Sequence, residues 1–276
     1  LFFTQKGKCF WMRVYEIPEG SKNSKGRAIQ NLINIEQDDR IKAFICTQDL
    51  KDEEYVNSNY VIMATKMGQV KKTSLEQYSR PRSNGINAIT IKEGDELLAA
   101  KLTNGNSQIM LAVQSGKAIR FEESKTRPMG RNASGVRGIR LKDSKDVVVG
   151  MISVNDMDAN ILVVSENGYG KRSSLEDYRL TNRGGKGVKT ISITEKTGKL
   201  VTLKSVSDND DLMIINKSGI AIRMQVEDLR VMGRATQGVK VISIKDGDSI
   251  AAVAKVMKDD DDLEDINEIE FTGDSV

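Results

Sequence analysis

Basic residues recur at nearly fixed intervals along this 276-residue chain, and they are the residue types that bind phosphate groups. They fall into four sets. The first comprises Lys72, Arg120, Arg172 and Arg223, with Lys171 beside its third member. The second, in glycine-containing loops, comprises Arg27, Arg82, Arg131, Arg183 and Arg234, with Lys186 in the fourth loop. The third comprises Arg137, Lys189 and Lys240, and the fourth comprises Arg80, Arg127, Arg179 and Arg230. Glycines beside these residues would let the backbone approach an anion and offer N–H donors, so the pattern predicts a repeated phosphate-binding loop.

The distribution of charge also indicates a polyanionic partner. The net charge is only +3, but residues 259–276 contain nine Asp and Glu and no Lys or Arg. Residues 1–258 therefore hold all 42 basic residues against 30 of the 39 acidic ones, an excess of twelve positive charges. A basic body of this kind favours a polyanion as partner. The acidic tail is expected to be disordered, and it either solubilises the chain or competes for the basic surface.

The sequence offers little for catalysis. It contains no histidine, which excludes His-based acid–base chemistry and His metal ligands. Cys9 and Cys46 are the only cysteines, too few for a structural zinc site, and they favour a reducing cytoplasm. No apolar run approaches the ~18–20 residues that span a bilayer, and no signal peptide is recognisable. We therefore expect no catalytic residue, no metal, no cofactor and no membrane partner.

An internal repeat must position the basic residues. A short apolar run leads into a turn glycine five times, at Gly7, Gly68, Gly116, Gly168 and Gly219, with separations of 61, 48, 52 and 51 residues. An apolar run, a glycine and a second alternating segment predict a β-hairpin. A loop, another short strand and an acidic turn such as that at 92–95 follow, so each repeat predicts about four strands. The predicted repeats span about 1–59, 60–107, 108–159, 160–210 and 211–258, and radial repetition of four-stranded sheets predicts a propeller-like, all-β architecture.

Five segments carry a family resemblance that extends to about Lys258. They are LFFTQKGKCFWMRVYEIP at 1–18, SRPRSNG at 79–85, MGRNASGVRGI at 129–139, ENGYGKR at 166–172 and MGRATQGVKVI at 232–242. Together, in this order, they resemble the C-terminal domain of the A subunit of bacterial DNA gyrase, a type IIA topoisomerase. The resemblance implies a six-bladed β-pinwheel in which blades exchange strands. It also implies a non-catalytic domain that wraps double-stranded DNA around a basic perimeter, so that an ATP-dependent holoenzyme can introduce negative supercoils.

The same resemblance implies the partners and the location. Besides double-stranded DNA, these would be the rest of the gyrase A subunit and the gyrase B subunit in an A2B2 holoenzyme, in the bacterial cytoplasm and associated with the nucleoid. The isolated domain is expected to be monomeric. The catalytic tyrosine of the family belongs to an N-terminal region, and no tyrosine of this chain has a matching context.

One family motif departs from the expected pattern. The family carries a loop of the type Gln-basic-Arg-Gly-Gly-basic-Gly upstream of the segment that matches residues 1–4. The loop at 183–187 is similar, but it lies in the fourth repeat and follows Thr181 and Asn182 instead of Gln and a basic residue. We therefore expect one blade to be incomplete in this chain.

Two alternative functions and one alternative role for the basic residues stay open. The chain could be the equivalent domain of the topoisomerase IV A subunit, or a propeller that binds proteins rather than DNA. Individual arginines could brace neighbouring blades against Glu76, Glu176 or Glu227 instead of contacting phosphates.

Overall fold

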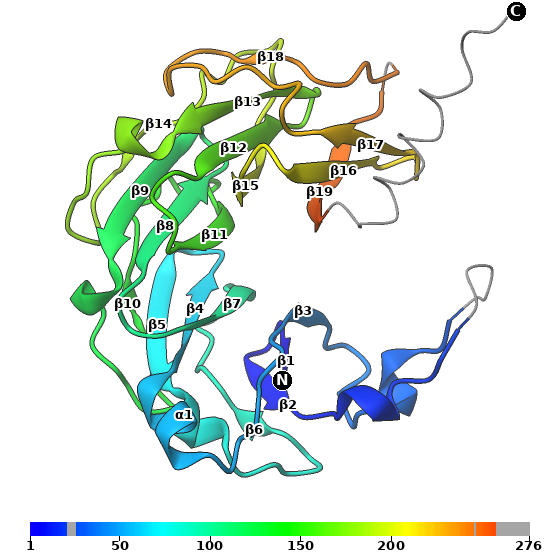
Figure 1. Cartoon of the computed structure of the whole chain (residues 1–276), viewed down its shortest axis with the longest axis vertical. Helices are drawn as coiled ribbons and strands as arrows, with labels where there is room; N and C mark the ends of the chain where they lie inside the picture. The colour runs from blue at the N-terminus through cyan, green and yellow to red at the C-terminus, as the bar shows by residue number, and fades with distance from the viewer. Residues whose placement is uncertain (21–25, 246, 258–276) are drawn as a thin grey trace, which may run out of the picture. The chain divides into compact units, whose positions relative to one another are not determined.

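The computed structural model describes residues 1–20, 26–245 and 247–257, and within these ranges the chain folds into five antiparallel β-sheets (Figure 1). The predicted acidic tail lies outside the described residues. No helix in the described part of the chain is long and apolar enough to cross a membrane. The prediction of an all-β protein built of four-stranded sheets is confirmed.

Each repeat forms the body of one sheet. The first sheet has the order β3 (Ile41–Phe44), β1 (Phe2–Thr4), β2 (Lys8–Phe10) and β6 (Ile86–Asn87). The second has β10 (Val136–Arg137), β5 (Gln69–Ser74), β4 (Tyr60–Thr65) and β7 (Leu97–Thr103). The third has β11 (Val148–Val154), β8 (Gln108–Val113), β9 (Lys117–Glu122) and β14 (Val188–Lys189). The fourth has β15 (Leu200–Val206), β12 (Asn160–Ser165), β13 (Tyr169–Ser174) and β18 (Val239–Lys240), and the fifth has β17 (Ala221–Gln225), β16 (Asp210–Asn216) and β19 (Ile250–Met257).

Helical segments are short and join the strands. The α-helix α1 (Glu53–Ser58) begins at Asp52, whose side chain accepts a hydrogen bond from the Tyr55 N–H at 3.1 Å. Single 3₁₀ turns are η1 (Val14–Glu16), η2 (Ile29–Asn31), η3 (Leu75–Tyr78), η4 (Glu123–Lys125) and η5 (Leu175–Asp177). Most of these turns directly follow the second strand of a hairpin, and they start the path from one sheet to the next.

The inner strand β4 is apolar on both faces because the second sheet packs between the first and the third. In β4, Val61 and Met63 belong to one buried cluster that includes residues of the first sheet. Ile62 and Ala64, on the opposite face, belong to a second cluster that includes residues of the third sheet. A strand that is buried on both faces reads as a continuous apolar run rather than an alternating one.

The outer strand of each four-stranded sheet comes from the following repeat. The strands β6, β10, β14 and β18 each pair with the second hairpin strand of the preceding repeat. As a result, the chain divides into two compact units that do not follow its linear order. Residues 1–157 and 178–190 form the first unit, and residues 158–177 together with those described from 191 onward form the second.

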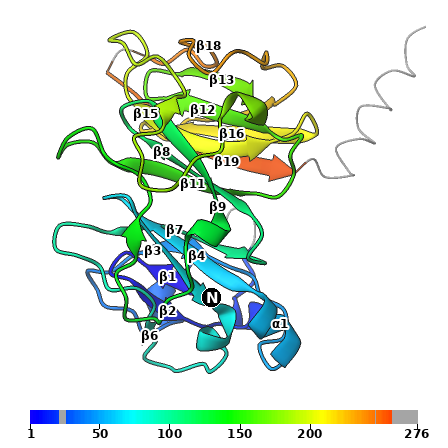
Figure 2. The same cartoon turned by 90° about the vertical axis from the view of Figure 1, so that its left-hand side faces the viewer.

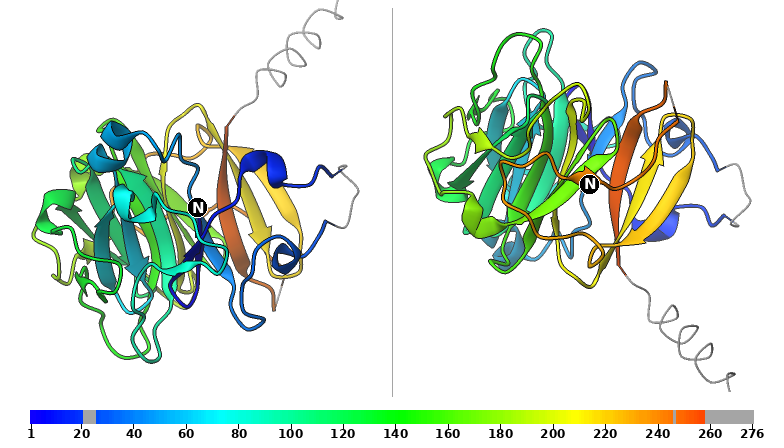
Figure 3. Two further views of the ribbon diagram at one scale, coloured as in Figure 1. Left: turned by 90° about the horizontal axis from the view of Figure 1, so that it is seen from below. Right: turned by 90° about the horizontal axis from the view of Figure 1, so that it is seen from above.

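The predicted number of six blades is wrong for this chain. Five repeats give five sheets in the described residues, because each repeat supplies the body of only one sheet. The fifth sheet has three strands, since the described residues contain no later repeat that could donate a fourth strand to β17. Figure 3 shows this sheet, with β19 in orange beside the gold strands β16 and β17.

Within each unit, one edge of every sheet faces its neighbours and the donated strand forms the opposite edge. In the first unit β3, β7 and β11 lie side by side (Figure 2), whereas β6, β10 and β14 are the far strands of the same sheets. In the second unit β15 contacts β19, and β18 is the far strand. The donated strands thus mark the outer edge of each four-stranded sheet.

Candidate nucleic-acid interface

Four equivalent stretches, here called the crossover segments, lead from a 3₁₀ or β-turn to a donated strand. They comprise residues 79–87, 126–137, 178–189 and 229–240. Together they contain twelve Lys and Arg and no Asp or Glu. The chain as a whole carries 42 basic and 39 acidic residues, so these segments concentrate positive charge at the outer edges of the sheets.

The backbone of each crossover segment is fixed to the sheet that it crosses. Pro128 forms a β-bridge with Lys72, and the Met129 N–H donates to the Lys72 carbonyl at 2.7 Å. The Thr181 N–H makes the same bond to the Arg120 carbonyl at 2.9 Å. In the second unit the Met232 N–H bonds to the Arg172 carbonyl at 2.8 Å. The side chains that these segments carry therefore start from well-defined backbone positions.

Glycine lets the segments approach the strands closely. Gly135, Gly187 and Gly238 have φ values of 85°, 70° and 81°, a conformation that side chains disfavour. A Cβ at Gly135 would lie 2.5 Å from the Val70 carbonyl oxygen, and one at Gly187 would lie 2.4 Å from that of Ala118. The glycine that the sequence pattern places before each third-set basic residue is thus required by both φ and space.

In the first four repeats, the residue at the first-set position points into the protein, where it braces the next repeat. Trp11, which takes this place in the first repeat, donates from Nε1 to the Tyr78 carbonyl at 2.8 Å. Arg120 donates from Nη1 to the Tyr178 carbonyl at 3.0 Å. Arg172 donates from Nη2 to the Glu227 backbone carbonyl at 3.4 Å, and its Nη1 pairs with the carboxylate of Asp208. Bracing is therefore the role that the contacts of this set support.

Burial distinguishes the members of this set from surface cations. Lys72, Lys171 and Arg172 are buried, so their side chains do not reach a phosphate in this structure, and we withdraw them as direct contacts. Lys72, in β5, lies 3.6 Å from the buried carboxylate of Glu123, in the turn η4. Arg223, in the sheet without a donated strand, stays exposed and pairs with Asp211 at 2.7 Å.

The loop arginines of the second set are partly exposed and partly engaged. Arg183 donates from Nε to the Lys125 carbonyl at 2.9 Å and from Nη1 to the Arg137 carbonyl at 3.1 Å. Arg234 donates from Nε to the Asp177 carbonyl at 2.9 Å. Each guanidinium has five N–H donors in a fixed planar geometry, so these bonds to backbone carbonyls orient the group. Arg27, Arg82 and Lys186 of the same loops are exposed, and Arg131 is half-buried.

All members of the third and fourth sets that lie in the crossover segments are exposed. All three members of the third set, which lie on the donated strands, are exposed: Arg137, Lys189 and Lys240. The fourth set, just after the turns, is exposed too: Arg80, Arg127, Arg179 and Arg230. Within the described part of the chain, the fourth set makes no side-chain hydrogen bond or ion pair. The side chains of the fourth set are therefore available to an external anion.

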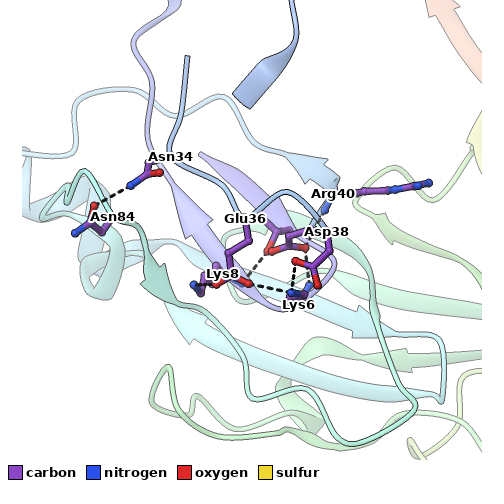
Figure 4. A network of polar contacts seen from close by, with 9 residues as sticks. Lys6, Lys8, Asn34, Glu36, Asp38, Arg40 and Asn84 are labelled. Atoms are coloured by element: carbon purple, nitrogen blue, oxygen red, sulfur yellow. Dashed lines mark hydrogen bonds and ion pairs between the residues drawn. The ribbon is translucent and has the colours of Figure 1, made fainter. Parts of the chain in front are cut away.

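The loop of the first repeat that is equivalent to the crossover segments has a different structure. Residues 26–35, which carry Arg27, do not form a donated strand and instead pack on their own sheet. Lys6 Nζ pairs with Glu36 at 2.9 Å and with Asp38 at 2.6 Å, and Lys8 Nζ pairs with Glu36 at 2.6 Å (Figure 4). The two ammonium groups hold the pKa of Glu36 at about 2. Both lysines therefore form ion pairs within the protein.

Two exposed cations were missed because no repeat predicts them. Lys125 and Arg140 flank the crossover segment at 178–189, whose Gly185 carbonyl accepts the Arg140 N–H at 2.8 Å. Neither residue has a basic counterpart at the same offset in the other repeats. Only the fold places them beside the predicted set.

The fold and the placement of charge define a class of protein. It is a propeller-like repeat protein whose sheets exchange strands and whose outer edges are formed by segments rich in Lys and Arg. The sequence profile described as "DNA gyrase C-terminal domain, beta-propeller" matches residues 1–48, 59–104, 108–155, 159–207 and 210–257. The chain therefore belongs to the DNA gyrase C-terminal domain family.

Individual relatives agree with this assignment. The chain is 45% identical over 262 residues to the DNA gyrase A subunit of Staphylococcus epidermidis and 44% identical over 263 residues to that of Staphylococcus aureus. In both comparisons the alignment covers 95% of this chain and 29% of the relative, so this chain spans less than a third of these proteins. Among solved structures, the C-terminal domain of DNA topoisomerase IV matches with a TM-score of 0.84 and 25% identity, covering 98% of this chain and 83% of that one. The DNA gyrase A C-terminal domain matches in fold with a TM-score of 0.78 and 24% identity, covering 93% and 81%. The higher identity to the gyrase subunits favours gyrase over topoisomerase IV.

Proposed function

We propose that the crossover segments bind the phosphates of double-stranded DNA and that the chain wraps the duplex along the outer edges of its sheets. The observation that carries this proposal is the presence of twelve basic and no acidic residues on four structurally equivalent segments. The names of the relatives, which are subunits of a DNA-supercoiling enzyme, support the choice of DNA as the polyanion.

The energetics require a repeated site. Bending ~36 bp through half a turn costs on the order of 12 kcal/mol for a persistence length of ~150 bp. Neutralising each phosphate releases condensed counterions, which favours binding at low salt. About ten contacts along a curved path could offset the bending energy, whereas one cluster could not.

The binding is expected to be independent of base sequence. Direct readout needs a helix or ribbon that enters the major groove. The α-helix α1 has six residues, and Glu53 and Glu54 lie in its first turn, where they would repel phosphates. The exposed cations lie on loops and two-residue strands, which suit backbone contacts.

The whole protein extends this role. We infer that the chain is the C-terminal part of a gyrase A subunit and that the rest of that polypeptide, with the gyrase B subunit, forms an A2B2 holoenzyme. The catalytic tyrosine then lies in the N-terminal part, and wrapped DNA is passed to that region for ATP-dependent negative supercoiling. This places the protein in the bacterial cytoplasm at the nucleoid, and the isolated chain is a monomer.

A further blade completes the pinwheel in this proposal. The residues seven and ten positions after the turn glycine are buried in the second to fifth repeats, as Leu75 and Tyr78 are against the first sheet. Their counterparts in the first repeat, Val14 and Ile17, are 76% and 49% exposed. We propose that a blade from the rest of the polypeptide covers them. Val14→Asp would then leave the 276-residue chain as stable as before and destabilise the full-length protein, and equal effects on both would contradict the proposal.

Duplex binding and its dependence on salt test the function. The combined variant replaces the fourth set by glutamine: Arg80, Arg127, Arg179 and Arg230. The matched control replaces four exposed lysines outside the crossover segments: Lys101, Lys145, Lys199 and Lys217. Each lost phosphate contact lowers the slope of log K against log salt by about 0.9, so the variant should lose roughly 3–4 in slope.

The control separates specific contacts from net charge, since both variants lose four charges. Equal slopes for the two variants would exclude the crossover segments as the binding surface. Wrapping is tested by closing relaxed plasmid with a type I topoisomerase in the presence of the chain. A linking number that does not shift would contradict wrapping, even if binding is strong.

A further inference from the structure

Two lysines are fully buried at the same place in the fold. The third residue after the turn glycine is Lys71 in β5 and Lys171 in β13, and both side chains are 0% exposed. The corresponding residues in the first and third repeats, Phe10 and Ile119, are buried and apolar. An apolar residue therefore suffices to pack a sheet at this position, and the lysines need another reason.

The buried ammonium groups hold the loops that carry the second basic set. Lys71 Nζ donates to the Ala88 carbonyl at 2.6 Å and to the Arg131 carbonyl of the next crossover segment. Lys171 Nζ donates to the Gly233 carbonyl at 2.6 Å, the residue before Arg234, and to Thr236 Oγ1 at 3.1 Å. In both cases the bond fixes the backbone from which a loop arginine projects.

The third repeat reaches the same result without a lysine. In this repeat Gly138 takes the place of Ala88. The Gly138 carbonyl accepts a hydrogen bond from the Gly184 N–H at 2.6 Å. Gly184 has a φ of 80°, which directs its N–H toward this carbonyl. In the preceding loop the residue equivalent to Gly184 is Asn132, and there Lys71 donates the hydrogen bond to the Ala88 carbonyl instead. The residue types at these two positions thus compensate for each other.

We infer that Lys71 and Lys171 are positioning residues for DNA binding: each holds, through backbone carbonyls, the loop whose arginine contacts a phosphate. This inference rests on the proposed function. Unlike the exposed cations, the two lysines would influence affinity without touching DNA. The expected partner of Lys71 is Arg131, and that of Lys171 is Arg234.

The test measures duplex affinity of the 276-residue chain against salt for Lys71→Ile, Arg131→Ala and the two combined. Loss of one phosphate contact should reduce the salt slope by about 1 in each single variant and lower the affinity several-fold. Because both changes remove the same contact, the combined variant should bind like either single one. Ile119→Val, at the same position in the third repeat, is the control for altered packing and should keep the wild-type slope.

A rescue variant adds a readout that general loss of stability would not move. Lys71→Ile with Asn132→Gly introduces the glycine donor of the third repeat and should restore both the slope and the affinity. If Lys71→Ile does not fold, Lys171→Ile with Arg234→Ala provides the same cycle in the second unit. A folded Lys71→Ile chain with wild-type slope and affinity, or additive effects in the cycle, would overturn the inference. A wild-type chain that does not bind duplex DNA would instead overturn the proposed function.

Discussion

Replacing Gly135 by alanine should detach a crossover segment from the second sheet. Gly135 has a φ of 85°, and an added Cβ would lie 2.5 Å from the carbonyl oxygen and 3.0 Å from the carbonyl carbon of Val70. Both atoms are backbone, so no side chain can move aside. Gly130, in the same segment, has no atom within 4 Å of an added Cβ and no positive φ, which makes Gly130→Ala the matched control.

The expected loss is the sum of two effects. Alanine in the left-handed region costs about 1–2 kcal/mol. Relief of the clash requires β10 to leave β5, which breaks the pairing of Val136 with Val70 and of Arg137 with Gln69. Each backbone hydrogen bond contributes about 0.5–1.5 kcal/mol net. Gly135→Ala should therefore lower the free energy of unfolding by about 3 kcal/mol, and Gly130→Ala should change it by less than ~0.5 kcal/mol.

Urea unfolding of the two variants and the wild type, followed by circular dichroism, measures the difference. Amide exchange of Gly138, whose N–H donates to the Gly68 carbonyl at 2.8 Å, adds a local readout, since it should become fast only in Gly135→Ala. If the two alanine variants unfold within ~0.5 kcal/mol of each other, the close approach of the segment to β5 does not contribute to stability and our reasoning fails.

Three further predictions concern charged groups. Burial lowers the pKa of Lys71 from 10.5 to about 7, so between those values the unfolded chain binds more protons and stability rises with pH, by at most about 1.4 kcal/mol per unit. Lys71→Ile should flatten this slope in urea unfolding at pH 7 to 10, and an unchanged slope would refute the assignment. Lys72→Met leaves the carboxylate of Glu123 buried without its cation and should cost about 3 kcal/mol in thermal unfolding; Glu123→Gln in the same chain should recover part of the loss, and no recovery would contradict the ion pair. Lys6→Gln should raise the pKa of Glu36 from about 2 in an NMR titration while stability changes little, because the pair is exposed, and a fixed pKa would argue against the contact.

The sequence by itself determined the repeat, its hairpins and the all-β class, because turn glycines and apolar runs are local signals. It also located the cationic loops, since their spacing is kept from repeat to repeat. Only the tertiary structure decided which repeat completes which sheet: β10 lies in the third repeat but pairs with the second. Pairing over such distances depends on contacts between segments that no local pattern encodes.

The same limit applies to the individual cations. Lys171 and Lys186 look alike as residue types, but the first is buried under carbonyl groups and the second is exposed. A strand position that faces the neighbouring sheet buries its side chain, and a loop position beyond the glycine does not. Burial is a property of the packed sheets, so the sequence could predict that the chain carries a basic surface but not which ammonium groups reach it.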